Sequence, residues 1–305
     1  MKLYNGMFLL AEIFVLLFKV LYYICESVYK LFAPVKEKSV AGEIVLVTGA
    51  GRGIGKELAI GYALLKATVV CWDINEETNQ QTKNEIKKMG TDSVHAYRCD
   101  VTNREEVFKM AEKVRTEVGD VTILINNAGL GIVKTLLNYS DDEITRTINV
   151  NVIAHYWMLR AFLPSMIENN HGHVVALSSG LGIATSIYST VYSPTKFAVR
   201  ALMEAVNEEL RLSSKGKSLI KFTTAFPTVV FNRMFKKPII KFPSLVSPLY
   251  PKEAASLIIN AQRKNYRERG ILFRVIPLLS FLRNFPNKAQ ECIKDFVNLS
   301  VEPDN

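Results

Sequence analysis

The sequence predicts an α/β protein in which a doubly wound parallel sheet forms a single domain with an N-terminal membrane anchor. Two patterns carry this prediction. Short apolar runs alternate with helical patterns from Glu43 to about Phe226, as expected where helices join parallel strands, and an apolar stretch of nineteen residues occupies Met7–Cys25. The 305 residues suit one large domain with appendages. We expect an anchor with a basic linker at 1–38, the α/β domain at 39–270 and an apolar, basic tail at 271–305.

The apolar stretch at Met7–Cys25 is long enough for a membrane helix. As a helix it would extend roughly 28 Å, close to the roughly 30 Å of a bilayer's hydrocarbon core. Glu12 and Lys19 interrupt it, and a charge at the centre of a span costs on the order of 3 kcal/mol, so a hairpin or interfacial anchor is an alternative. No small-x-small site follows, which disfavours a cleaved signal peptide. The lysines after the stretch outnumber the one before it, which predicts a cytosolic domain.

A glycine-rich run follows the first predicted strand, which ends in the apolar residues 44–47. The run is Thr48-Gly49-Ala50-Gly51-Arg52-Gly53-Ile54-Gly55, and a helix is predicted after it at Lys56–Lys66. Glycines let the backbone approach a phosphate closely, and the start of a helix offers free N–H groups and a positive dipole end. The spacing is G-x-x-x-G-x-G and not the commoner G-x-G-x-x-G. The run therefore predicts a dinucleotide site but needs support from elsewhere.

That support comes from Asp73, eighteen residues after Gly55, at the end of a second predicted strand, 68–72. A carboxylate at this spacing can accept hydrogen bonds from the adenosine ribose and would repel a 2′-phosphate, which favours NAD over NADP. Arg52 argues the other way, because a cation in the loop could pair with that phosphate; we weigh the carboxylate more heavily. Asp100 ends a third predicted strand, 95–99, and is either an adenine contact or a helix cap.

Tyr192 and Lys196 form a Y-x-x-x-K pair, and Ser179 lies thirteen residues before the tyrosine. Residues four apart share one face of a helix. A tyrosine has an ordinary pKa near 10, and a neighbouring cation is expected to lower that pKa and make the phenol a better base. The Ser179 hydroxyl can hold the substrate oxygen. Together with the dinucleotide site, these residues predict an oxidoreductase.

Over roughly residues 40 to 235 these motifs resemble the short-chain dehydrogenases/reductases. Asn126-Asn127-Ala128-Gly129, after a predicted strand at 123–125, is similar to the family's NNAG element, and Asn151 matches the asparagine that anchors a water in the proton relay. The resemblance implies a Rossmann-type fold and catalytic roles for Asn151, Ser179, Tyr192 and Lys196, with Ser179 and Tyr192 contacting the substrate. The cofactor-binding residues that it implies are Gly49, Arg52, Gly53, Ile54, Gly55, Asp73, Asp100, Val101, Asn127, Ala128, Gly129, Tyr192, Lys196 and Pro227.

Four further segments are similar to the membrane-associated branch of that family, which contains retinol dehydrogenases and 17-beta-hydroxysteroid dehydrogenases. They lie at 40–46, 71–75, 117–121 and 170–174. This resemblance implies interconversion of a lipophilic alcohol and its carbonyl, with retinol/retinal as the first choice and a steroid or fatty alcohol as the second. It also implies a substrate lid at about 228–250, and an endoplasmic-reticulum membrane location shared with lipid droplets. We further expect a homodimer.

Two departures from the family pattern motivate a rival hypothesis, a non-catalytic membrane or lipid-droplet scaffold. Asn232-Arg233 replace a threonine-glycine pair whose hydroxyl helps to hold the cofactor, and Ser193-Pro194-Thr195 replace small residues between the tyrosine and the lysine. Proline is tolerated only in the first turn of a helix. We therefore predict that the helix carrying Tyr192 begins close to that residue.

The net charge of +9 is partly carried by the last quarter of the chain. Mixed with apolar residues at 271–273 and 275–282, these cations predict a second contact with anionic lipid, the alternative being an ordinary terminal helix. No DNA- or RNA-binding motif is present, so we expect no nucleic-acid partner. The four cysteines have no metal-ligand spacing and we expect no metal site; Cys71 and Cys99 fall on predicted central strands and should be buried thiols.

Overall fold

The computed structural model describes residues 2–33, 35–228, 230, 238–241, 248–271, 281, 284–297 and 299–301. The chain divides into two compact units, Met1–Lys38 and Ser39–Asn305. Asn232-Arg233, most of the expected lid and the first part of the expected tail lie outside the described residues.

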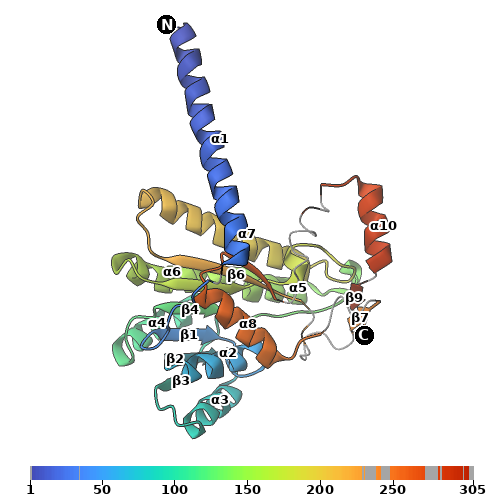
Figure 1. Cartoon of the computed structure of the whole chain (residues 1–305). Coiled ribbons are helices and arrows are strands. Elements are labelled where there is room, and N and C mark those ends of the chain that lie inside the picture. Colours follow the sequence, from blue (N-terminus) through green and yellow to red (C-terminus); the bar gives the residue numbers. More distant parts are fainter. Residues whose placement is uncertain are drawn as a thin grey trace. The chain divides into compact units, whose positions relative to one another are not determined.

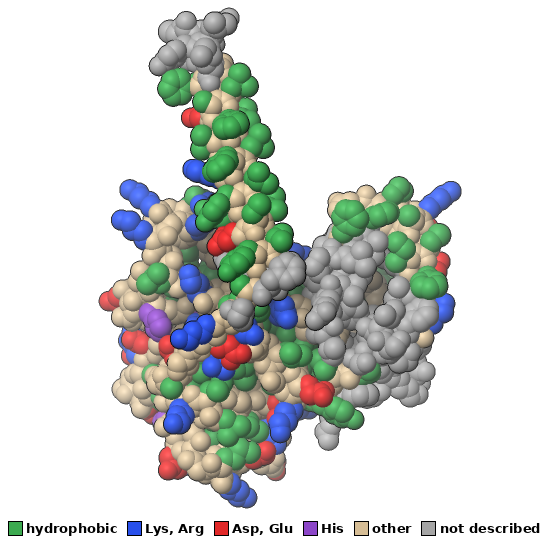
Figure 2. Space-filling model, viewed as in Figure 1, with side chains coloured by type: hydrophobic (Ala, Val, Ile, Leu, Met, Phe, Trp, Pro, Cys, Tyr) green, Lys and Arg blue, Asp and Glu red, His purple; other side chains and the backbone are tan. Residues whose placement is uncertain are grey.

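The first unit is one long helix, α1 (Lys2–Phe32). Its segment Phe8–Tyr29 is long and apolar enough to cross a membrane, and none of that segment is buried; Figure 2 shows hydrophobic side chains along the visible face of the helix. Glu12, Lys19 and Glu26 are seven residues apart, close to two helical turns, so they follow one face. The charges therefore leave most of the helix surface apolar.

The described part of the second unit contains a seven-stranded parallel sheet in the order β3-β2-β1-β4-β5-β6-β8, which confirms the predicted doubly wound architecture. The chain runs outward from β1 in both directions, so the strand order reverses between β1 and β4, where α/β sheets bind ligands. The strands are β1 (Ile44–Thr48), β2 (Thr68–Asp73), β3 (Val94–Arg98), β4 (Ile123–Asn126), β5 (His173–Leu177), β6 (Lys221–Pro227) and β8 (Glu268–Ile271).

Helices cover both faces of the sheet (Figure 1). One face packs against α2 (Gly53–Leu64), α3 (Glu76–Lys88) and α8 (Pro251–Arg263), and the other against α4 (Arg104–Glu117), α6 (Ala154–Glu168) and α7 (Tyr192–Ser213). Strand residues alternate between the two cores: Val45 and Val47 face the first and Leu46 the second. Burial on both faces explains why the strands read as continuous apolar runs.

Smaller elements complete the unit. They are the 3₁₀ turns Leu136–Asn138 and Gly180–Gly182, helix α5 (Asp141–Ile148), a π-helical turn at Asn149–Ile153, helix α10 (Asn287–Val297), and an antiparallel pair of β7 (Pro238–Ile240) and β9 (Leu299–Val301). The β7–β9 pair brings the end of the chain to the segment that follows β6.

The predicted strands at 44–47, 68–72, 95–99 and 123–125 match observed strands to within one residue at every boundary. Helix α2 starts at Gly53, three residues before the expected Lys56, because the last glycines of the run already form its first turn. Cys71 and Cys99 are buried and free, as expected.

Candidate active site

The glycine-rich loop joins β1 to α2 at the carboxyl edge of the sheet, and several of its positions are too strained or too crowded for a side chain. Gly49 has a φ of +67°, a conformation that other residues rarely adopt. A Cβ at Gly55 would collide with the Gly49 carbonyl oxygen and lie 2.5 Å from Asn127 Nδ2. The loop therefore folds tightly against the start of α2, and bare backbone is left to face a ligand.

Thr48 and Asn127 hold this loop against the end of β4. The Thr48 hydroxyl accepts hydrogen bonds from the backbone N–H groups of Asn127 and Ala128, each at 3.0 Å. The Asn127 side chain donates in return to the carbonyl oxygens of Thr48 at 2.8 Å and Gly49 at 3.3 Å. The glycine run and the 127–129 segment are thus fixed together where the strand order reverses.

Asp73, at the end of β2, points at the glycine loop. Its Oδ2 accepts from the Gly51 N–H at 2.9 Å and its Oδ1 from the Asn75 N–H at 2.9 Å. A Cβ at Gly51 would lie 2.9 Å from Asp73 Oδ2, so glycine is what permits this approach. Arg52 is exposed and forms no ion pair within the described part of the chain. The carboxylate is therefore held rigidly beside the loop, while the arginine is directed to solvent.

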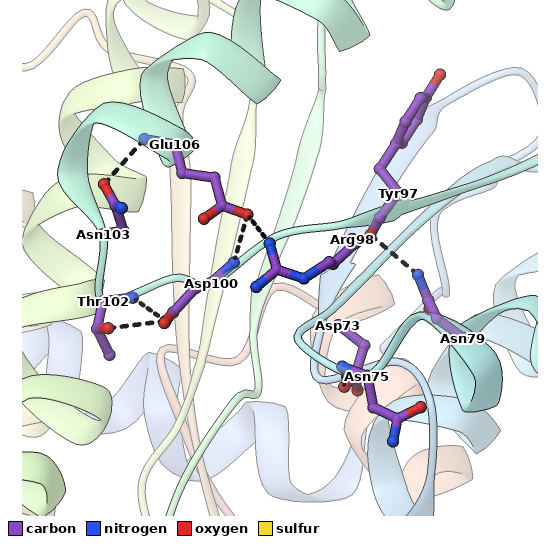
Figure 3. Close-up of polar contacts among 9 residues, drawn as sticks. All are labelled: Asp73, Asn75, Asn79, Tyr97, Arg98, Asp100, Thr102, Asn103 and Glu106. Carbon is purple, nitrogen blue, oxygen red and sulfur yellow. Dashed lines mark hydrogen bonds and ion pairs between the residues drawn. The ribbon is translucent and has the colours of Figure 1, made fainter.

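Asp100 is not the cap of the following helix, so that alternative is wrong. Helix α4 begins at Arg104, and its cap is Asn103, whose side chain accepts from the Glu106 N–H at 3.1 Å. Asp100 lies three residues before the cap, and its Oδ1 instead accepts from the Thr102 N–H at 2.9 Å and hydroxyl at 2.7 Å. Figure 3 shows this loop folded on itself at the end of β3.

The helix that carries the proton-transfer pair, α7, begins at Tyr192, as predicted, so Pro194 occupies its first turn and breaks no helical hydrogen bond. Tyr192 and Lys196 are both buried. The Lys196 ammonium lies 5.5 Å from the centre of the Tyr192 ring and donates to the Leu177 carbonyl oxygen at 2.8 Å. Ser179 hydrogen-bonds to the Tyr192 side chain. The structure thus brings all three predicted groups together.

Burial dominates the protonation of this pair. It raises the pKa of Tyr192 to about 12, and the Ser179 hydroxyl opposes that rise. It lowers the pKa of Lys196 to about 8. The lowering of the Tyr192 pKa expected from Lys196 is not what this structure gives, because removing the phenolate from water costs more than its neighbours return.

Asn151 lies in the π-helical turn between α5 and α6 and is fully buried. Its side chain accepts from the Leu130 N–H at 2.8 Å and donates to the Leu130 carbonyl oxygen at 2.8 Å and to the Thr195 hydroxyl at 3.1 Å. Thr195 donates in turn to the Tyr192 carbonyl oxygen at 2.6 Å. Asn151 therefore ties the loop after Gly129 to the first turn of α7.

Three further predicted residues, Gly129, Val101 and Pro227, lie at different points along the carboxyl edge of the sheet. A Cβ at Gly129 would lie 3.5 Å from Asn151 Oδ1 and 3.7 Å from Lys196 Nζ, which places Gly129 beside the proton-transfer group. Val101 is buried in the second core. Pro227 ends β6 in register with Ile271.

Sequence reasoning missed three residues that organise this edge: Thr48, Thr195 and Glu106. Each acts through contacts with segments 6 to 80 residues away in the chain, through Asn127 and Ala128 for Thr48, Asn151 for Thr195 and Asp100 for Glu106. These contacts cannot be read from the sequence. A hydroxyl beside each predicted motif was the only available signal, and it would have pointed to Thr48 and Thr195 but not to Glu106.

The family described as short chain dehydrogenase matches residues 43–238 of the chain. The chain belongs to that family. Epidermal retinol dehydrogenase 2 of Homo sapiens is 38% identical over 292 residues, covering 94% of this chain and 93% of the relative. The 17-beta-hydroxysteroid dehydrogenase 13 of Homo sapiens is 41% identical over 230 residues, or 75% of this chain and 76% of the relative. The resemblance read from the motifs is confirmed, and the chain is a dehydrogenase/reductase.

Solved structures of the family share the fold. A short-chain dehydrogenase/reductase from Burkholderia phymatum in complex with NAD has a TM-score of 0.71 at 22% identity, covering 88% of this chain and 99% of that one. A metagenomic short-chain oxidoreductase in complex with NADP has a TM-score of 0.62 at 26% identity, covering 76% and 96%. Together with the family match, the second of these structures supports a nicotinamide dinucleotide as cofactor. Helix α1, whose segment Phe8–Tyr29 is long and apolar enough to cross a membrane, is compatible with association with a membrane.

Proposed function

We propose that this chain uses NAD to interconvert a lipophilic alcohol and its carbonyl compound, with retinol and retinal as the first candidate pair. The observation that carries the proposal is the buried group of Tyr192, Ser179 and Lys196, in which a phenol, a hydroxyl and a cation meet at the start of α7.

The residues at the carboxyl edge fit a dinucleotide. The bare backbone of the glycine loop and the start of α2 suit the pyrophosphate. Asp73 is placed to bind the adenosine ribose, and Asp100 and Val101 are placed to contact the adenine. The segment of Asn127, Ala128 and Gly129 is placed to contact the part of the dinucleotide between its two ends. Lys196 has three N–H donors and Leu177 uses one, so two are left for ribose hydroxyls. When bound, the dinucleotide accepts a hydride from an alcohol or donates one to a carbonyl.

The chain's own residues then move the proton. Tyr192 takes the proton from the substrate hydroxyl in oxidation and returns it in reduction. Ser179 donates a hydrogen bond to the same oxygen as charge develops on it. Lys196 stabilises the phenolate form of Tyr192, and Asn151 positions the first turn of α7 through Thr195. The four intact groups also argue against the rival hypothesis of a non-catalytic scaffold.

The preference for NAD rests on Asp73. Its carboxylate is fixed by two backbone N–H groups, so it cannot swing away from a 2′-phosphate. We expect Asp73→Ala to raise kcat/KM for NADP relative to NAD about tenfold, because one like charge beside the phosphate is removed. Asp73→Asn keeps an acceptor for the Gly51 N–H and should give the same change. Asp92→Ala, an exposed carboxylate at the amino end of β3, serves as the control; an unchanged ratio in both Asp73 variants would remove the argument for NAD.

A membrane location supports a lipophilic substrate. We place the chain in the endoplasmic-reticulum membrane, with the catalytic unit in the cytosol and lipid droplets as a second location. Because Glu12, Lys19 and Glu26 follow one face of α1, the helix can keep its charges together while the rest of its surface meets lipid. In the part of the tail that the structure describes, Phe281, Phe285 and Phe296 are exposed, which is consistent with a second contact with lipid.

The names of the relatives point to both candidate substrate classes, since one names retinol and the other names 17-beta-hydroxysteroids. Cofactor reduction by the membrane-embedded full chain, with all-trans-retinol, estradiol and a long-chain alcohol, tests the proposal. We expect turnover with retinol and NAD. Turnover with estradiol alone would favour the steroid alternative, and binding of a dinucleotide without turnover of any of the three would favour the scaffold.

A further inference from the structure

Arg98 lies next to Asp73, the carboxylate that we expect to bind the adenosine ribose. It is the last residue of β3, and its register partner on β2 is Asp73. Neighbouring strands lie about 4.8 Å apart, and residues in register on parallel strands project from the same face of the sheet. Asn79 of α3 donates to the carbonyl oxygens of Cys71 at 2.9 Å and Tyr97 at 3.0 Å, which holds the two strand ends together. The cationic residue Arg98 is therefore fixed next to the expected ribose site.

That cation does not pair with Asp73. The guanidinium of Arg98 donates to Glu106 Oε1 at 2.8 Å, and Figure 3 shows it turned across the strand end toward the start of α4. The Asp73 carboxylate is occupied instead by the N–H groups of Gly51 and Asn75. Among the residues that the structure describes, no cation pairs with the Asp73 carboxylate.

Glu106 is the residue that sets this arrangement. The same Oε1 accepts from the Asp100 N–H at 3.1 Å, so one carboxylate holds both the arginine and the loop at the adenine end. The Glu106 side chain is 23% exposed and that of Arg98 is 51% exposed. Arg98 has room to move if its partner is lost, and a guanidinium matches a phosphate group well in charge and geometry.

We propose that Glu106 is a specificity-determining residue for the dinucleotide, because it holds Arg98 away from the ribose 2′-position and so leaves Asp73 to disfavour a 2′-phosphate. The proposal rests on the dinucleotide site described under the proposed function. Released from Glu106, Arg98 would either neutralise Asp73 or meet the 2′-phosphate, and both changes favour NADP.

Glu106→Gln tests this proposal with little disturbance, since the amide oxygen of glutamine can still accept from the Asp100 N–H. Dissociation constants for NAD and NADP, measured by titration calorimetry on the full chain in detergent, give a readout that does not depend on turnover. We expect the Kd for NADP to fall about tenfold and that for NAD to change less than twofold. The gain should shrink as salt is raised, because it comes from a partly exposed charge.

Two further variants isolate the cause. Glu112→Gln removes a carboxylate on the same helix that pairs with Arg115 at 2.6 Å, and it should leave both constants unchanged. In an Arg98→Gln background, Glu106→Gln should no longer alter the ratio of the two constants.

Two results would overturn the proposal. The first is that the ratio of the two dissociation constants is unchanged in Glu106→Gln while both dinucleotides still bind. The second is that Glu106→Gln changes this ratio equally with and without Arg98, which would assign the effect to the Asp100 loop. If Glu106→Gln does not fold, Glu106→Ala takes its place in the same comparison. A wild-type chain that binds neither dinucleotide would instead contradict the proposed function, and this proposal with it.

Discussion

Tyr192→Phe is expected to lower kcat about a thousandfold while the Kd for the dinucleotide changes less than threefold. The substitution removes one oxygen from a buried ring and leaves the packing of the first turn of α7 in place. That oxygen is the proton-transfer atom in the proposed mechanism, and general acid–base groups contribute on the order of 10²–10⁴ to rate. Steady-state kinetics with retinol and calorimetric titration with NAD measure the two quantities separately.

Tyr156→Phe is the matched control, because Tyr156 lies exposed on α6, outside the predicted site. It should leave kcat within a factor of two. If Tyr192→Phe turned over at the wild-type rate, another group would have to move the proton, and the assignment of Tyr192 would fail. If it lost dinucleotide binding as well, the phenol would be needed to build the site and the kinetic loss could not be assigned to proton transfer.

Lys196→Met is expected to make the protein more stable while it abolishes turnover. A pKa of about 8 in the folded chain, against 10.5 for the free side chain, means that burial of the charged lysine costs about 3 kcal/mol near neutral pH. Methionine fills similar space without a charge but forfeits the hydrogen bond to the Leu177 carbonyl oxygen, worth about 1 kcal/mol. The free energy of unfolding should therefore rise by about 2 kcal/mol.

The pH dependence of that gain identifies its cause. Between pH 8 and 10.5 the unfolded chain still holds the lysine proton and the folded chain does not, so the stability of the wild-type protein rises with pH in that window. The advantage of Lys196→Met should be full below pH 8 and shrink as the pH approaches 10.5. Lys88→Met, at an exposed lysine in the last turn of α3, should change stability by less than about 0.5 kcal/mol at any pH. Stability curves of wild type and Lys196→Met that stay parallel from pH 7 to 10.5 would contradict this account.

On this account, the buried charge of Lys196 lowers the free energy of unfolding, although the proposed mechanism needs that charge. Such a trade between stability and activity is common where a site needs a group that packing alone would exclude.

Local patterns in the sequence determined the order of strands and helices, the glycine turn and the start of α7. Each depends on residues close together in the chain: apolar runs for buried strands, glycines where backbone meets backbone, and a proline that only a first turn accepts. The pairing of Tyr192 with Lys196 belongs with them, because four residues make one helical turn. The family resemblance, carried by the same motifs, extended this to Asn151.

Only the tertiary structure decided how these groups are held and charged. The Asn151 side chain is used by Leu130 and Thr195, and Asn103 rather than Asp100 caps α4. The pKa of Tyr192 rises instead of falling, because desolvation depends on everything packed around the ring and not on the lysine four residues away. The contact of Arg98 with Glu106 likewise follows from how β3 ends beside α4. Spacing along the chain predicts which residues can meet, whereas burial and competing partners, which arise only when distant segments pack, decide what each of them does.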